Sequence, residues 1–74
     1  MQKEDLKFND KVFIIDEDSR TRWVRFAFVW KIFEDFVQLQ FLHDDCRREF
    51  FSRDFESCYK TEKEAIEALK RGLR

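Results

Sequence analysis

The chain has 74 residues, including ten Phe, two Trp and one Tyr, with one Gly and no Pro. A chain of this length forms one domain, spanning residues 1–74, whose small core needs the large area that buried aromatic side chains supply. Fifteen basic and sixteen acidic side chains leave a formal net charge of −1. The chain therefore lacks both the basic excess typical of nucleic-acid-binding proteins and the acidic excess of a DNA mimic.

The opening segment, Met1–Asp10, is polar, and we expect fraying over residues 1–6. Leu6 and Phe8 stand two apart, a spacing that can add a strand at a sheet edge. The next segment, Lys11–Asp16, is β-branched and apolar and predicts a buried strand. The polar sequence DEDSR that follows predicts a turn.

The alternating stretch Thr21–Phe33 is the clearest strand. Every second residue forms a fully apolar row: Val24, Phe26, Phe28, Trp30 and Ile32. The intervening row is mixed: Trp23, Arg25, Ala27, Val29 and Lys31. After a polar Glu34-Asp35 turn, Phe36–Leu42 alternates again, so the two runs predict a hairpin. We expect the mixed row to lie on the second, incompletely covered face of the sheet.

The stretch after His43 has two interpretations. Asp44 or Asp45 could cap a short helix that carries Cys46, Phe50 and Arg53. Alternatively, a polar loop precedes a fourth strand, REFFS, and we favour this second interpretation. The sequence SCYK then predicts a short fifth strand.

The final segment predicts a helix. Thr61 and Glu64 form a capping box, in which the Thr oxygen accepts from the Glu64 amide and the Glu carboxylate accepts from the Thr61 amide. One apolar stripe is expected to pack on the sheet: Ala65, Ile66, Leu69 and Leu73. Gly72 is placed to end the helix in a left-handed cap.

The two ends of the chain resemble small proteins encoded by bacteriophages and prophages of Gram-positive bacteria. Those proteins open with a strand of the form F-x-x-K-V-[YF]-x-I-D and close with a short strand, the motif T-x-x-E-A and a helix. The segment KFNDKVFIID (Lys7–Asp16) looks like the opening, and YKTEKEAIEAL (Tyr59–Leu69) looks like the close. This chain has Asn9-Asp10 and Glu56 at positions where those proteins often have Gly.

The resemblance implies an α+β fold, with a small SH3-like antiparallel sheet or partial barrel of about five strands and one C-terminal helix. It implies no enzymatic activity. Some small phage proteins inhibit host defence systems, among them anti-CRISPR proteins. We therefore expect a non-catalytic protein that binds and inhibits a bacterial host protein, such as a CRISPR nuclease or another antiviral component. The alternatives are a nucleic-acid-binding accessory domain and a homo-oligomeric structural protein, for which a homodimer is the commonest form.

Zinc binding and catalysis are weaker hypotheses. His43, Cys46 and Cys58 could bind zinc with Asp44 or Asp45 as the fourth ligand. Structural zinc sites usually show two clear ligand pairs, so we prefer to interpret both cysteines as small semi-buried hydrophobic residues. A Cys–His nucleophile would also need an oxyanion site and a substrate cleft, for which so small a chain has little material. We predict no catalytic residue, no metal site and no cofactor.

The basic and aromatic residues suggest where a partner binds. Two basic groups stand out: Arg20, Arg22, Arg25 and Lys31 around Trp23, and Arg47, Arg48 and Arg53. Their acidic neighbours favour a salt-bridged, solvated face over a nucleic-acid groove. A single helix covers only one face of the sheet, so apolar side chains on the other face are left for a partner. Trp, Phe and Arg are also common at interface hot spots or interface cores. We predict that the partner contacts four residues: Trp23, Arg25, Phe36 and Arg48.

The first residues, MQKEDLKFNDK, contain no apolar core of the length that a signal peptide needs. No run approaches the ~20 apolar residues of a membrane span. We expect the protein to act in the host bacterial cytoplasm, without membrane contact and with reduced cysteines.

Overall fold

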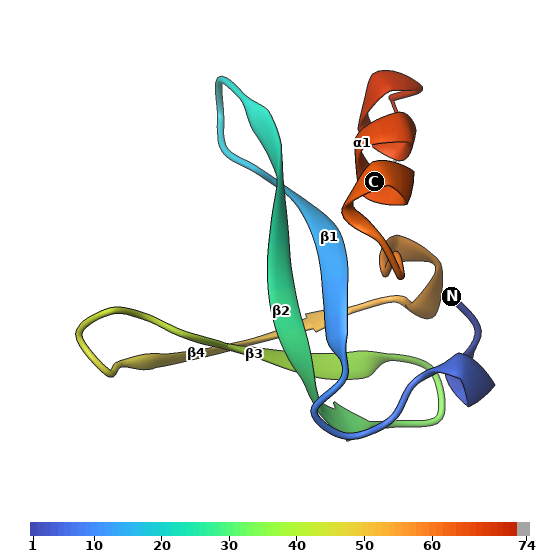
Figure 1. Ribbon diagram of the computed structural model, residues 1–74, viewed down its shortest axis with the longest axis vertical. Helices are drawn as coiled ribbons and strands as arrows, with labels where there is room; N and C mark the ends of the chain where they lie inside the picture. The colour runs from blue at the N-terminus through green and yellow to red at the C-terminus, as the bar shows by residue number, and fades with distance from the viewer. Residues whose placement is uncertain (73–74) are drawn as a thin grey trace.

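The structure, a computed structural model, describes residues 1–72. One antiparallel sheet has the strand order β1-β2-β3-β4, with β1 at Lys11–Glu17, β2 at Arg22–Ile32, β3 at Val37–Leu42 and β4 at Arg48–Arg53 (Figure 1). Helix α1 (Glu62–Lys70) follows the sheet, and short 3-10 helices span Lys3–Asp5 and Phe55–Ser57. The predicted α+β class is confirmed. The predicted loop followed by a strand after His43 is also confirmed.

The sheet consists of two hairpins, β1–β2 and β3–β4, that run in clearly different directions (Figure 1). Strand β2 pairs with β3 only over Phe28–Ile32, and the register shifts between Val29 and Lys31. A β-bulge of this kind increases the local twist and bends the strand. Toward Arg22, β2 is paired with β1 alone, so the hairpins diverge and a curved inner face forms between them.

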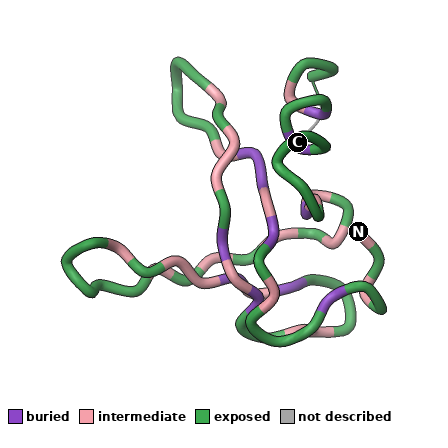
Figure 2. The backbone as a smooth tube through the Cα atoms, in the orientation of Figure 1, coloured by how far each residue is buried: buried purple, intermediate pink, exposed green. Residues whose placement is uncertain are grey.

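The core lies on this inner face. It comprises Leu6, Val12, Ile14, Ala27, Val29, Val37, Leu39 and Cys58. Buried positions gather where the hairpins and the N-terminal segment meet, and both hairpin turns are exposed (Figure 2). The expectation that the mixed row of β2 would be the incompletely covered face is therefore wrong at its centre, since Ala27 and Val29 are fully buried. At its centre β2 contributes small side chains, Ala27 and Val29, to the inner face, whereas its larger Phe26 and Trp30 rings lie on the outer face.

The bulge explains a second departure from strict alternation. Val29 pairs with Leu39 and Ile32 pairs with Val37, so these two residues of β2 face the same side although they are three apart. Ile32 accordingly packs against the core. Period-two alternation had grouped Ile32 with the outer aromatic row, because a bulge residue is not visible in the pattern.

The predicted fifth strand is reduced to a single bridge. Phe13 and Tyr59 exchange two backbone hydrogen bonds, each 2.8 Å long. The 3-10 helix Phe55–Ser57 lies immediately before this bridge, and the helix cap Thr61 lies just after it. The sheet therefore has four strands, because too few residues remain between these elements to extend the pairing.

The N-terminal segment closes the open side of the core. Leu6 is buried, whereas Phe8 is exposed, and neither belongs to a strand, which corrects the predicted strand edge. The Met1 amino group donates to the carbonyls of Phe55 (3.1 Å) and Cys58 (3.0 Å). Asn9 has φ of 69°, a left-handed conformation that Asn tolerates better than most residues.

Helix α1 begins after the predicted cap residue, with the Thr61 hydroxyl accepting from the Glu64 amide at 3.2 Å, whereas the predicted return bond from the Thr61 amide to the Glu64 carboxylate is not formed among the described residues. Gly72 has φ of 80°, as the predicted left-handed cap requires. The buried helix residues are Ala65 and Ala68, whereas Ile66 is exposed, so the packed stripe is rotated from the predicted one. Leu73 lies outside the described residues. The helix packs against β1 and β2, and within residues 1–72 no helix is long and apolar enough to cross a membrane.

Candidate interaction surface

The outer face of the sheet carries a group of exposed apolar side chains. We call Phe8, Phe26, Trp30, Leu42 and Phe50 the aromatic face. The Trp30 ring contacts Phe8 and Phe50, with centroid distances of 5.8 and 5.5 Å, so these three rings form a continuous row. The exposed fraction of these five residues ranges from 37% for Trp30 to 65% for Phe8. A contiguous apolar surface of this kind is typical of a binding site.

The charges near the aromatic face are mostly positive. Strand pairing and alternation place Lys11, Lys31 and Arg48 on the outer side, where Lys11 lies 4.6 Å from the centre of the Phe26 ring. The acid that the strands place on this side is Glu17, which pairs in register with Arg22 and lies 4.0 Å from it. The sheet therefore separates charges that the sequence intermingles, and this face combines rings with three cations, Lys11, Lys31 and Arg48, that have no ion-pair partner within residues 1–72.

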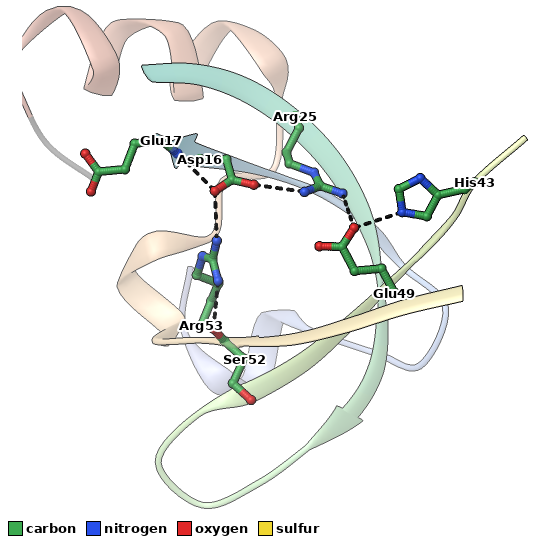
Figure 3. A network of polar contacts seen from close by, with 7 residues as sticks. All are labelled: Asp16, Glu17, Arg25, His43, Glu49, Ser52 and Arg53. Atoms are coloured by element: carbon green, nitrogen blue, oxygen red, sulfur yellow. Dashed lines mark hydrogen bonds and ion pairs between the residues drawn. The ribbon is translucent and has the colours of Figure 1, made fainter. Parts of the chain in front are cut away.

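The inner face carries a polar network beyond the apolar core (Figure 3). Arg25 donates to Asp16 at 2.8 Å and to Glu49 at 3.4 Å. His43 Nε2 lies 2.9 Å from the same Glu49 oxygen, and an Arg53 nitrogen lies 3.6 Å from Asp16. The Arg25 guanidinium also lies 4.9 Å and 5.0 Å from the ring centres of Phe41 and Phe51. Arg25 thus connects β1, β2 and β4 where the two hairpins diverge.

Burial and hydrogen bonding set the pKa values of this network. Burial alone would raise the pKa of Asp16, but hydrogen bonds from Arg25 and the Glu17 amide, with the charges of Arg25 and Arg53, hold it below its usual range. Hydrogen bonding to His43, followed by Arg25, lowers the pKa of Glu49. Burial opposes the charge of Arg25, yet its two carboxylate partners raise its pKa. The carboxylates of Asp16 and Glu49 and the guanidinium of Arg25 are therefore charged at neutral pH.

The four predicted contact residues do not form one surface. Trp23 is 39% exposed and lies on the same side of β2 as Arg25, which is occupied by the network. Phe36 lies in the β2–β3 turn and stacks on Phe33 at 4.6 Å. Arg48 belongs to the outer side, with Phe50. The pattern of alternation does not identify Trp30 and Phe50 as contact candidates, because it favours burial of the fully apolar row that contains Trp30 and assigns no face to Phe50.

The structure separates the residues considered for zinc binding. Cys58 is fully buried in the core, whereas Cys46 is exposed in the β3–β4 turn. Burial raises the pKa of the Cys58 thiol to about 11, which disfavours the thiolate that binds metals or attacks substrates. Within residues 1–72, no three His, Cys, Asp or Glu side chains are grouped to hold a metal ion.

Comparisons with protein-family models, with curated proteins and with solved structures found no match to this chain.

Proposed function

We propose that this protein is a non-catalytic binding protein whose partner is another protein that docks on the aromatic face. The observation that supports this proposal is the row of exposed rings formed by Phe8, Trp30 and Phe50. Exposing these rings to water is unfavourable, and buried Trp side chains often supply much of the binding energy at interfaces. The flanking Lys11, Lys31 and Arg48 favour a partner whose apolar surface is bordered by carboxylates.

The biological role we propose is inhibition of a bacterial host protein by a phage-type or mobile-element-type accessory protein, acting in the host cytoplasm. A CRISPR nuclease or another antiviral component is the target class. Resemblance of the two ends of the chain to small phage proteins supports this role, and the same resemblance supports an SH3-like relationship for the bent sheet. A small protein can block a nuclease simply by covering its working surface, so the proposal requires no catalytic residue.

The chain offers a matched pair of variants for the test. Trp30 and Trp23 lie on the same strand with nearly equal exposure, 37% and 39%, but on opposite faces of the sheet. The tagged protein would be used to capture partners from nuclease-treated bacterial lysate, with binding to the captured protein then measured in purified form. We expect Trp30→Ala to weaken binding by about tenfold or more, and Trp23→Ala to leave it nearly unchanged.

The reverse result would move the contact to the inner side, with Trp23 and Arg25 as first predicted. Unchanged binding for both variants would refute a contact through either face of β2. Circular dichroism of each variant would show that the fold is retained.

Single-stranded nucleic acid is the second candidate partner, because the aromatic face combines rings with cations. Bases stack on aromatic side chains while Lys and Arg contact phosphates. This candidate predicts binding of a fluorescent oligonucleotide that weakens steeply with salt and is reduced by Lys11→Glu. No binding at low salt would eliminate it.

A further inference from the structure

Within residues 1–72, the outer edge of β4 has no backbone partner. Strand β4 is the last strand of the sheet, and within residues 1–72 the bridge outside the named strands joins Phe13 to Tyr59 at the other edge. A strand edge of this kind presents unpaired N–H and C=O groups that can pair with another chain. The side chains of β4 determine which chain can pair with this edge.

Register identifies the backbone groups that point outward. The backbone amide of His43 donates to the Arg47 carbonyl at 2.9 Å. These two residues are therefore a hydrogen-bonded pair at the start of the β3–β4 ladder. Hydrogen-bonded and non-hydrogen-bonded pairs alternate along antiparallel strands. Glu49, Phe51 and Arg53 therefore bond to β3, whereas the backbone groups of Arg48, Phe50 and Ser52 point away from the sheet.

The side chains of this edge are complementary to themselves. In an antiparallel pairing of two copies about a two-fold axis at Phe51, Arg48 of each copy lies opposite Asp54 of the other. In the same register, Glu49 lies opposite Arg53, and Phe50 lies opposite Ser52. For Phe50 and Ser52, outward backbone groups then meet outward groups, as the ladder requires, whereas the Asp54 carbonyl already accepts from the Ser57 amide at 3.0 Å, so Asp54 contributes its side chain. An axis at Phe50 would instead oppose Arg47 to Arg53, and an axis at Glu49 would oppose two carboxylates.

Two charges at this edge are available for such a pairing. Among the described residues, the exposed Arg48 and Asp54 side chains have no ion-pair partner, in contrast to Arg25 or Arg53. The Ser52 carbonyl accepts from the Arg53 guanidinium at 3.0 Å but keeps a second lone pair for a neighbouring strand.

We propose that a second copy of this chain binds along β4 in the Phe51-centred register. The dimer has a continuous sheet of eight strands, four from each copy. Cross-strand ion pairs form between Arg48 and Asp54 on the outer side, while Glu49 and Arg53 stay in the inner network with Arg25 and Asp16. The two aromatic faces become neighbours on one extended surface. This inference does not require the partner proposed above, although Arg48 and Phe50 belong both to the β4 edge and to the surface proposed for that partner.

Charge reversal tests the register directly. Sedimentation equilibrium from about 1 µM to about 1 mM would measure the dimer dissociation constant. Arg48→Glu places two carboxylates opposite each other, and Asp54→Arg places two guanidinium groups opposite each other, so each should raise the constant by about tenfold or more. The double variant restores both pairs with reversed polarity and should return the constant to within about threefold of the original. Arg20→Glu, in the exposed β1–β2 turn, is the control for the change in net charge.

A monomer over the whole concentration range would overturn the proposal. Dimerisation that is equally strong in both single variants would overturn the register. A second measurement needs no variant. The amides of Phe50 and Ser52 should exchange hydrogen more slowly at high protein concentration than at low concentration, and equal exchange at both concentrations would exclude β4 as the interface.

Discussion

Arg25 illustrates how one residue can stabilise an open arrangement of hairpins. Its guanidinium is bonded to Asp16 on β1 and Glu49 on β4, and it lies close to the rings of Phe41 and Phe51. Arg suits this position because its planar group donates in several directions and also packs on aromatic rings. The sequence predicted Arg25 as a partner contact, and its local pattern contained no sign of these distant carboxylates.

The network predicts a loss of stability in acid. The folded-state pKa values of Asp16 and Glu49 lie below their ordinary values of 3.8 and 4.5. Their contribution is therefore complete above about pH 4.5 and is lost as the pH falls through the lower folded values. Urea unfolding at pH 7 should show that Asp16→Asn lowers the free energy of unfolding by roughly 1–3 kcal/mol.

The difference between Asp16→Asn and the original protein should shrink as the pH falls below 3.8 and through the lowered folded-state pKa of Asp16, because Asp16 itself then becomes protonated. Asp44→Asn, in the exposed β3–β4 turn, is the matched control and should have little effect at either pH. An Asp16→Asn effect that stays constant with pH would show that the ionic network does not contribute in this way.

At the scale of elements, the sequence predicts best those features that depend on hydrogen bonds and backbone conformation among residues close in the chain. The cap at Thr61 and the left-handed Gly72 mark the limits of α1 as the sequence predicted. The bulge in β2 has no such local marker, although it determines that Val29 and Ile32 both face the core. The predicted fifth strand is likewise limited to one bridge at Tyr59, because a 3-10 helix precedes it and α1 follows it.

Loss of the helix cap should have a measurable cost. Thr61→Ala removes the acceptor for the Glu64 amide and should reduce the free energy of unfolding by about 1 kcal/mol. Thr61→Ser keeps the hydroxyl and should be nearly neutral. Urea unfolding of the two variants would test this, and equal stabilities would mean that the cap does not contribute.

At the scale of the whole molecule, one small core on the inner face stabilises both hairpins, and the aromatic face remains outside it. Leu39 and Leu42 lie on the same strand, with Leu39 fully buried and Leu42 58% exposed. Small domains have little stability in reserve, so removal of one central side chain can unfold a large part of the population.

Leu39→Ala should lower the free energy of unfolding by about 2–5 kcal/mol, through lost burial and the cavity that remains. Leu42→Ala should change it by about 0.5 kcal/mol or less. Circular dichroism during urea unfolding would compare them. Similar losses for both variants would contradict the assignment of the core to the inner face.

The sequence by itself predicted the four strands, the hairpin between β2 and β3 and the start of the capped helix, because alternation and capping act between residues close in the chain, but it also predicted a fifth strand that is only a bridge. Only the tertiary structure decided which side of β2 is buried. A period-two pattern divides a strand into two rows but does not say which row meets the rest of the protein. Curvature selected Ala27 and Val29 for the interior and left Phe26 and Trp30 outside, since space within a bent sheet depends on contacts between distant segments.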